Sequence, residues 1–560
     1  MAYGGTQETE GIMRKGNRAW IAGLAIVLAL GMWHLNDVRS GAVQSGDGWL
    51  VDRYLLLLAM VLAVTVTLAF FLSGKTDGRG RGLERVYPLA GAFLGLLYMV
   101  VLPPLSAPDE ISHYISAYQL SSHLLGQPAN SEDGHVLVRP EDWFLEDVHG
   151  DYVYGIQDGQ RVKQGTKDGS GLATVLGQTL TEETYRVIHQ VGLGRQQGPA
   201  EQGLAQSPYP PVVTTPLAFM PQALGLCLAR LIKGNSLCLV YLGRLTNLLF
   251  FVGVTWMAMK RLPFGKEVLF SVALLPMTLH LSASFSYDAW IMAGIFYFTA
   301  YCLNLAYEAE QVRMADILVL AAVMAAVGPC KMVYMVFAGL CLLIPLHKFK
   351  SRRNWLLSAC IVLAAMALGM AFTSSWRVAS HVAGTENSMG WAEETGYTLG
   401  ALLHQPMKCM QMFFNTVARQ SEQYFRTMVG ACLGNLDPVL DITDPVVFLL
   451  AVCLMCIALR KPEEPLMLTG GRRLWVWVLC ISCAGATMLS MLLSVTPVGA
   501  QVIGGVQGRY FLPFLPILLM TVKNNSLVMA RDQAREWLYA MCCANGYILL
   551  RIYSTVSIRL

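Results

Sequence analysis

Charged residues are scarce in this chain. Asp, Glu, Lys and Arg make up 14% of its 560 residues, whereas soluble domains average about 25%. Hydrophobic residues make up 54%, and the mean hydropathy is +0.47. The net charge is only +4, so nothing in the composition points to a nucleic-acid partner. The scarcity of charge predicts a membrane protein.

Motifs of several soluble protein classes are also absent. The polar segment 106–208 contains no cysteine, which excludes a disulfide framework there. Cys453 and Cys456 form a CxxC pair, but no His or further Cys flanks it, so we expect no zinc site. The loops carry neither a Walker nor a dinucleotide-binding glycine pattern. This argues against an ATP-driven transporter and against a nucleotide-sugar enzyme with a soluble catalytic domain.

Long apolar blocks are plentiful instead, and about 20 residues of helix cross a hydrocarbon core. We therefore expect an all-α polytopic membrane protein with about 13 transmembrane helices. The first block follows Arg14, Lys15 and Arg18 without a small-residue cleavage site, so we interpret it as a spanning helix and not as a cleavable signal peptide. The expected blocks are 19–36, 54–72, 86–105, 237–258, 266–283, 288–307, 313–329, 331–347, 355–373, 446–459, 474–494, 511–522 and 536–553.

The segment 211–232 is apolar, with prolines crowded around its start, and could form a further span. A re-entrant or interfacial helix agrees better with the charges. If the N-terminus is cytoplasmic and this segment does not cross, the basic clusters between spans all face the cytoplasm, as the positive-inside rule requires. Arg551 and Arg559 near the C-terminus are exceptions. The clusters are Lys75, Arg79, Arg81 and Arg85; Lys260, Arg261 and Lys266; Arg313; Lys348, Lys350, Arg352 and Arg353; Arg460, Lys461, Arg472 and Arg473; and Lys523, Arg531 and Arg535.

This topology divides the chain into three parts. Residues 1–85 form two additional N-terminal helices and a basic cytoplasmic loop, 86–525 form the transmembrane core, and 526–560 form a C-terminal transmembrane helix. Two large loops of the core, 106–208 and 374–440, then face the outside. The first is inserted after the third span and carries 14 acidic against six basic residues. Patterns such as 151–155 and 158–160 predict turns and short strands in it.

An acidic motif follows the third expected span directly. Pro108 suits the start of a helix, which places Asp109 and Glu110 in its first turn and His113 on the same face as Asp109. An acid beside a histidine at a membrane surface is the arrangement that a general base or a divalent-ion ligand needs. Helix capping alone would also explain acids in a first turn.

Two further motifs lie on the same expected face. Tyr209, followed by Pro210 and Pro211, is either an aromatic anchor at the membrane boundary or a rigid wall of a substrate groove. Asp288 begins the span after a short outer turn, where it is either a helix cap or a second carboxylate of the site that contains Asp109.

Three cations lie near the outer ends of spans, against the positive-inside bias. They are Arg244, Lys331 and Arg509, the last within the glycine-rich run 504–510 that also holds Gln507 and Tyr510. Cations at membrane depth usually face a cavity or a partner, although snorkelling to the headgroups is an alternative. Arginine grips phosphate with a bidentate fork, and glycine turns let backbone amides approach an anion. We therefore predict a phosphate site.

These motifs together resemble a large bacterial family of multispanning proteins, a domain of unknown function placed in the GT-C glycosyltransferase clan. The likeness covers about residues 86–525. The first of its motifs, Asp109-Glu110 with His113, resembles the acidic signature of the GT-C enzymes. The others are Tyr209-Pro210-Pro211, Gly243-Arg244-Leu245, Leu275-Pro276-Met277 with Ser284 and Asp288, Lys331-Met332-Val333-Tyr334, and Gly505-Val506-Gln507-Gly508-Arg509-Tyr510.

The resemblance implies an inverting glycosyltransferase that moves a sugar from a polyprenyl-phosphate donor to an envelope glycan or lipid acceptor, such as a lipopolysaccharide. Asp109 would be the general base, oriented by Glu110 and His113. Arg244, Lys331 and Arg509 would hold the lipid phosphate, with Gln507, Tyr510 and Tyr209 lining the substrate site. Asp288 would be a supporting acid or a metal ligand. The outer loops contain no DxD pair, so no metal or other cofactor is expected to be required.

The implied location is the bacterial inner membrane, with a cytoplasmic N-terminus and the active site on the periplasmic face. A non-enzymatic transporter or flippase of lipid-linked saccharides is the alternative from another class, since it too needs outward cations and a lipid groove. Such a transporter would distribute ionisable residues through the depth of the bilayer, whereas the centres of these spans are almost uncharged. A polymerase or ligase of polyprenyl-linked glycans shares the donor chemistry and stays open.

Overall fold

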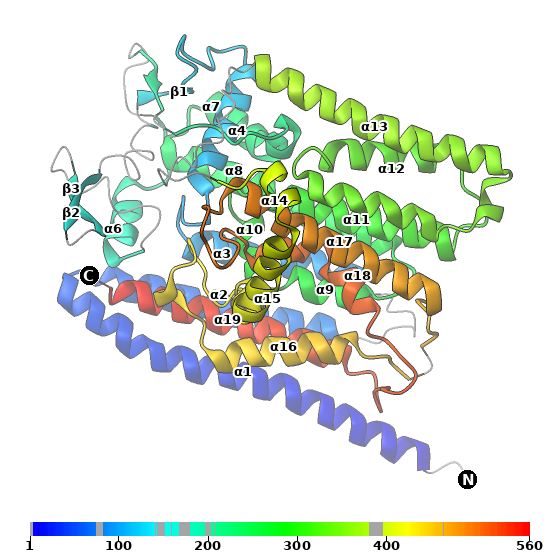
Figure 1. Ribbon diagram of the computed structural model, residues 1–560. Coiled ribbons are helices and arrows are strands. Elements are labelled where there is room, and N and C mark those ends of the chain that lie inside the picture. Colours follow the sequence, from blue (N-terminus) through cyan, green and yellow to red (C-terminus); the bar gives the residue numbers. More distant parts are fainter. Residues whose placement is uncertain are drawn as a thin grey trace.

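The computed structural model of the protein is predominantly helical (Figure 1). The structure describes residues 4–73, 82–140, 142, 152–157, 160–166, 180–196, 203–207, 209–379, 396–462 and 464–559. Long helices run side by side and form one bundle, and short elements gather at its left end in Figure 1.

Within the described residues, seven helices are long and apolar enough to cross a membrane. They are hydrophobic over most of their surface, as expected where lipid replaces water around a helix. The seven are the segment Ala19–Ser45 of α1 (Gly4–Ser45), α2 (Trp49–Ser73), α3 (Leu83–Val101), α8 (Ser236–Arg261), α11 (Asp288–Tyr307), α13 (Arg352–Ala379) and α17 (Gly470–Ser494). A multispanning membrane protein is therefore confirmed, whereas the expected count of about 13 is not.

Several expected spans are shorter helices. One expected block, 266–283, was wrong as a single span: it is divided into α9 (Lys266–Ala273) and α10 (Pro276–Ser282). The break arises because Pro276 has no amide hydrogen for the helix ladder and instead occupies the first position of α10. The shorter helices are α12 (Met314–Val327), η3 (Met332–Leu343), η4 (Leu346–Phe349), α16 (Asp444–Ala458), η6 (Gly508–Phe514) and α18 (Leu515–Met520).

The expected C-terminal helix is α19 (Ala534–Ser557), which packs against α1, α2 and α16. Its Tyr553 hydroxyl donates to the Leu50 carbonyl oxygen at 3.1 Å, and its Asn545 accepts from the Tyr98 hydroxyl at 2.7 Å. The two N-terminal helices and the C-terminal helix, which are distant in sequence, therefore form one side of the bundle (Figure 1).

The segment 211–232 forms η2 (Pro216–Phe219) and α7 (Met220–Leu231). Sixteen residues rise about 24 Å as helix, less than the ~30 Å hydrocarbon core. Both of its ends contact the same end of the bundle. Before it, the Val212 amide donates to Ser116 Oγ at 2.8 Å; after it, the Gly234 carbonyl accepts from Arg139 at 3.2 Å. This geometry agrees with an interfacial or re-entrant helix.

The polar segment 106–208 contains the predicted short strands. β1 (Leu137–Val138) pairs with β4 (Ala205–Gln206), and β2 (Tyr152–Gln157) forms an antiparallel hairpin with β3 (Gln160–Thr166). The first residues of the two predicted turns, 151 and 158, lie outside the described residues. Two helices, α4 (Glu110–Leu124) and α6 (Glu182–Val191), complete this part. α6 is held on the bundle by Tyr185, whose hydroxyl donates to the Val101 carbonyl at 2.8 Å.

The second predicted loop, 374–440, holds α14 (Leu399–His404), α15 (Pro406–Val429) and the short η5 (Pro438–Leu440). Thr427 of α15 accepts from the Gly508 amide at 3.1 Å, and Asp437 pairs with Arg559 at 2.5 Å. Thr427 thus joins the C-terminal part of α15 to the start of η6, and Asp437, directly before η5, joins this segment to the chain end after α19.

The predicted cytoplasmic loops meet one another at the opposite end. Their basic residues are held by acids and by carbonyl oxygens at helix ends, which suits cations near the negative pole of a helix dipole. The contacts join Lys266 to Glu84, Lys523 to Glu267 and Glu464, Lys461 to Glu267 and Asp532, and Lys348 to the carbonyls of Leu305 and Ala306. The described residues of these basic clusters thus gather at one end of the bundle.

Close packing of α7 on α8 provides a test of this arrangement. A Cβ added at Gly225 would lie 2.4 Å from the Leu242 carbonyl oxygen. We expect Gly225→Ala to destabilise the protein by about 1–3 kcal/mol through overpacking, measured as a lower thermal unfolding midpoint in detergent. Gly253 of α8 has open space around it, so Gly253→Ala is the matched control. Equal midpoints for the two variants would contradict the packing.

Candidate functional site

Four charged side chains of alternating sign form a continuous chain, hereafter the charge chain, at the end of the bundle that carries α6. Asp109 Oδ2 lies 2.7 Å from Arg509 Nη2, and Arg509 Nε lies 3.6 Å from Asp288 Oδ2. The other Asp288 oxygen, Oδ1, accepts from Lys331 Nζ at 3.0 Å. The structure therefore brings together four of the residues singled out in the sequence, from four separate elements.

Each member stands at the end of a helix, which explains why all four meet at one end of the bundle. Asp109 directly precedes α4, Asp288 is the first residue of α11, Lys331 precedes η3, and Arg509 lies in the first turn of η6. Neither acid caps its own helix through its side chain: Asp109 has no such hydrogen bond, and the Asp288 side chain is held by Lys331. A side-chain capping hydrogen bond therefore does not account for either acid, whereas a favourable interaction with the helix dipole stays open.

Asp109 has a left-handed backbone, with φ of 59°, which is uncommon for a residue other than glycine. Its side chain is 65% exposed, while the Arg509 side chain is only 3% exposed. Partial burial opposes ionisation of Asp109, but the Arg509 guanidinium outweighs it and holds the pKa of the carboxyl below its ordinary value. An accessible, ionised carboxylate therefore lies at one end of the charge chain.

His113 lies one turn further along α4 and is buried. Its ring packs edge-on against Tyr287 at 4.9 Å, and its Nδ1 atom has no hydrogen-bond partner among the described residues. Burial lowers the pKa of His113 to about 4, even though Asp109 and Asp288 act in the opposite direction. His113 is therefore neutral at pH 7 and adds no positive charge beside Asp109.

Lys331 lies between two aromatic rings at the other end of the charge chain. Its Nζ is 4.1 Å from the centre of the Tyr510 ring and 5.0 Å from that of Tyr287. Tyr510 is itself fixed, because its carbonyl oxygen accepts from the Tyr334 hydroxyl at 2.9 Å. Cation–π contacts and the bond to Asp288 thus hold the ammonium group in place.

The glycine-rich run lets η6 approach α15 very closely. A Cβ at Gly508 would lie 2.0 Å from the Tyr424 carbonyl oxygen, so the position requires glycine. Gln507 precedes this turn, and its side-chain oxygen is buried without a hydrogen-bond partner in the described part of the chain. The run therefore positions Arg509 through backbone contact.

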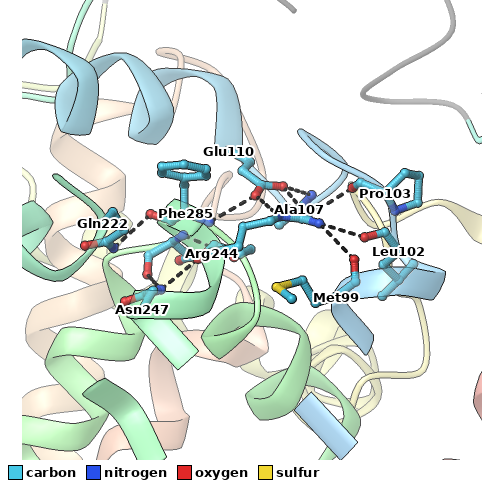
Figure 2. Close-up of polar contacts among 12 residues, drawn as sticks. Met99, Leu102, Pro103, Ala107, Glu110, Gln222, Arg244, Asn247 and Phe285 are labelled. Atoms are coloured by element: carbon cyan, nitrogen blue, oxygen red, sulfur yellow. Dashed lines mark hydrogen bonds and ion pairs between the residues drawn. The ribbon is translucent and has the colours of Figure 1, made fainter. Parts of the chain in front are cut away.

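Two of the predicted site residues, Glu110 and Arg244, have a different environment from the one expected of them (Figure 2). Both side chains are completely buried, and they form a bidentate ion pair at 2.8 and 2.9 Å. The remaining donors of Arg244 bond to carbonyl oxygens of Met99, Leu102 and Pro103. Arg244 therefore does not face the charge chain as a phosphate ligand, and we interpret the pair as a structural element.

This pair also fixes the turn that precedes Asp288. Glu110 accepts from the backbone amides of Ala107 at 3.0 Å and of Phe285 at 3.0 Å. The turn is held from the other side as well (Figure 2): Gln222 donates to the Phe285 carbonyl, and Asn247 donates to the carbonyls on both sides of that residue. The positions of Asp109 and Asp288 are thereby coupled.

Tyr209 lies on the segment before η2, half-buried against the hydrophobic core. Its backbone amide donates to Ser207 Oγ at 3.1 Å. The same segment approaches the charge chain further on, where Thr214 donates to the Cys330 carbonyl at 3.1 Å. The segment that begins at Tyr209 thus reaches the Lys331 end of the charge chain at Thr214, and the role of Tyr209 as a wall of the site stays a prediction.

An apolar cavity of about 450 Å³ adjoins the Lys331 end of the charge chain. It lies between η3 and the second half of α17, with Tyr510 and Arg377 at its polar side. Arg377, near the C-terminal end of α13, donates to the Val213 carbonyl at 3.1 Å. The sequence reasoning missed Arg377, whose only signal was a cation at the outer end of an expected span.

The described residues contain no group of three or more His, Cys, Asp or Glu side chains placed to hold a metal ion. Asp109 and Asp288 are the nearest approach to such a group, and each already pairs with a cation.

Comparison with known proteins identifies the family. Residues 92–518 match the family model described as "Predicted membrane protein (DUF2142)". The chain belongs to this family. The match covers most of the core predicted as 86–525 and leaves out α1, α2 and α19. No curated protein and no solved structure matches the chain.

The contrast between Glu110 and its neighbour provides a test. Removing one partner of a buried ion pair leaves an uncompensated charge, so we expect Glu110→Gln to cost about 3–5 kcal/mol of stability. Asp109→Asn, which breaks an accessible pair, should cost about 0–1 kcal/mol. Thermal unfolding in detergent measures both. Arg244→Gln with unchanged stability would contradict the structural role.

Proposed function

We propose that this protein is a membrane glycosyltransferase that moves a sugar from a polyprenyl-phosphate donor to a cell-envelope glycan or lipid acceptor. One observation carries the proposal. The charge chain begins at an accessible carboxylate, Asp109, and ends at a cation, Lys331, on the edge of an apolar cavity. A transfer from a lipid phosphate needs a base at the acceptor and a cation at the phosphate, beside a volume for the lipid.

The proposed reaction is a direct displacement. The Asp109 carboxylate takes the proton of an acceptor hydroxyl while that oxygen forms a bond to the anomeric carbon of the donor sugar. The bond between this carbon and the phosphate oxygen breaks, and the electron pair leaves with the polyprenyl phosphate. The configuration at the anomeric carbon is inverted. The low pKa of Asp109 keeps it ionised at neutral pH, as a base must be at the start of the step.

Lys331 is the proposed ligand of the phosphate. It is partly exposed, at 19% of its side chain, and Asp288 with the two tyrosine rings orients it. Positive charge fixed in place before the reaction stabilises the charge that the leaving phosphate gains. Arg377 at the same cavity is a second candidate ligand. The cavity volume falls in the range of small-molecule sites, about 300–1,000 Å³.

The positive-inside rule supports the orientation that we propose. The basic loop contacts gather at one end of the bundle and the charge chain at the other. In a bacterial inner membrane the basic end would face the cytoplasm. The charge chain would then lie at the periplasmic face, where polyprenyl-linked sugars and envelope acceptors meet.

Neutralising Asp109 tests the proposed base. Purified protein is incubated with polyprenyl-phosphate sugars and candidate envelope acceptors, and the glycosylated product is quantified. Loss of a general base typically costs 10²–10⁴-fold in rate, so we expect Asp109→Asn to lose at least ~100-fold of transfer. Glu183→Gln, which alters an exposed acid of α6, is the matched control. Full transfer by Asp109→Asn would rule out the assigned base, and movement of intact lipid-linked saccharide between leaflets without transfer would favour a transporter.

The pH dependence of transfer provides a second, independent test. A base with a pKa below its ordinary value of 3.8 stays ionised until the pH falls through that lower pKa. We therefore expect level activity from about pH 8 to pH 5 and an acid limb below about pH 4. Arg509→Gln removes the cation that lowers this pKa, so the acid limb should move to higher pH. An acid limb near neutrality that Arg509→Gln leaves in place would assign the base to another group.

A further inference from the structure

The helix α15 carries three distinct faces. Its buried face packs Met412, Thr416 and Tyr424 against the bundle. A second face is polar. The third is a stripe of large apolar side chains at spacings of three, four and three residues, hereafter the α15 stripe. It consists of Met407, Met410, Phe414 and Val417, which are 74%, 66%, 72% and 54% exposed.

Such a stripe is costly in water. Four adjacent exposed hydrophobic side chains on one helix face form a contiguous patch of the kind that marks an interaction surface. The spacing keeps the four on a single side of the helix, because residues three and four apart are neighbours on its surface. The stripe therefore requires a partner that the described residues of this chain do not supply.

The position of α15 identifies the partner. Both of its ends lie at the end of the bundle that carries the charge chain: Lys408, near the N-terminal end, lies over the ring of Tyr397, whose hydroxyl accepts from the Gly499 amide in the loop after α17. Asn415, halfway along, donates to the Gln501 carbonyl in the loop after α17, and its C-terminal part contacts Gly508. A helix with both ends at one end of the bundle does not cross the membrane, and α15 runs across the long helices in Figure 1. It therefore lies along the surface where the spans leave the bilayer.

The charges of α15 agree with a lipid surface. Its polar face holds Lys408 and Arg419 against one acid, Glu422, while Arg426 is paired with Asp441 and Asp444. Basic residues on the polar face, with Phe and Met on the other, are typical of helices that lie in the interface of anionic membranes. The buried face packs on Met488 and Leu492 of the span α17, so the stripe continues a surface that already faces lipid.

We propose that α15 is an in-plane membrane anchor. Its stripe inserts into the headgroup and acyl boundary of the leaflet at the charge-chain end, and its basic face binds anionic lipid. The anchor is joined to the site, because Thr427 holds the Gly508 amide directly before Arg509. The segment 374–440, expected as an outer loop, would thus hold Arg509 at the level of the lipid headgroups. This inference does not depend on the proposed glycosyl transfer.

Photocrosslinking tests the anchor without an activity assay. Benzoylphenylalanine replaces Phe414 in the full chain, and the protein is placed in lipid nanodiscs of phosphatidylethanolamine and phosphatidylglycerol. After irradiation, the mass of the intact protein is measured by mass spectrometry. We expect a lipid adduct at position 414 at least several-fold more abundant than with the same probe at Gln411 on the polar face. The probe at Phe448 of α16, which is 71% exposed, is the positive control for lipid contact.

Three outcomes would overturn the proposal. The first is no lipid adduct at 414 while the Phe448 probe reacts, and the second is equal labelling at 411 and 414. The third is a covalent dimer at 414, which would make a second copy of the chain the partner of the stripe. The basic face is tested separately: phosphatidylglycerol should be enriched among the adducts above its share of the bilayer, and Lys408→Gln should lower that enrichment. If the two lipids occur among the adducts in the same ratio as in the bilayer, the basic face has no preference for anionic lipid.

Discussion

The buried ion pair between Glu110 and Arg244 is the constraint on which the site depends. Taking both charges out of water costs several kcal/mol for each ion, and only complete hydrogen bonding offsets that cost. Here the bonding is extensive: Arg244 reaches three carbonyls at the end of α3, and Glu110 accepts two backbone amides besides the guanidinium. The pair thus joins α3, α4, α8 and the turn before α11, so Asp109 and Asp288 cannot shift independently of each other.

Two adjacent acids consequently have opposite roles. Glu110 is wholly buried and paired, whereas the Asp109 side chain is 65% exposed. The left-handed backbone at Asp109 makes this divergence possible, since it turns the chain sharply at the start of α4. A strained backbone conformation of this kind costs about 1–3 kcal/mol and is kept only where surrounding contacts hold the residue in place. At Asp109, the Glu110 contacts on one side and the ion pair with Arg509 on the other hold this conformation.

Features set by neighbouring residues could be predicted from the sequence, whereas contacts between residues far apart in the sequence could not. Hydropathy located the seven long spans, and 211–232, which the charge pattern set apart, contains only the shorter helices η2 and α7. The division of 266–283 could have been anticipated from Pro276. The pairing of Arg244 could not, because its partner is 134 residues away and a cation near the end of a span looks the same whether it binds a carboxylate or a phosphate. Arg377 and the α15 stripe went unrecognised for the same reason: their environment arises from packing.

The charge chain suits the proposed transfer for an electrostatic reason. The charges of its two carboxylates and two cationic side chains sum to zero, so without substrate the charge chain carries no net charge in a region of low dielectric. A polyprenyl-phosphate sugar brings one negative charge, and its release as a phosphate monoester adds up to one more. The proton that Asp109 takes from the acceptor removes one negative charge at the same step. The total is then nearly unchanged, and the reaction only moves negative charge from the Asp109 end toward Lys331. Arg509 and Asp288, fixed between these two ends, are the groups across which that displacement takes place, and because they are already oriented they need not reorganise as it occurs.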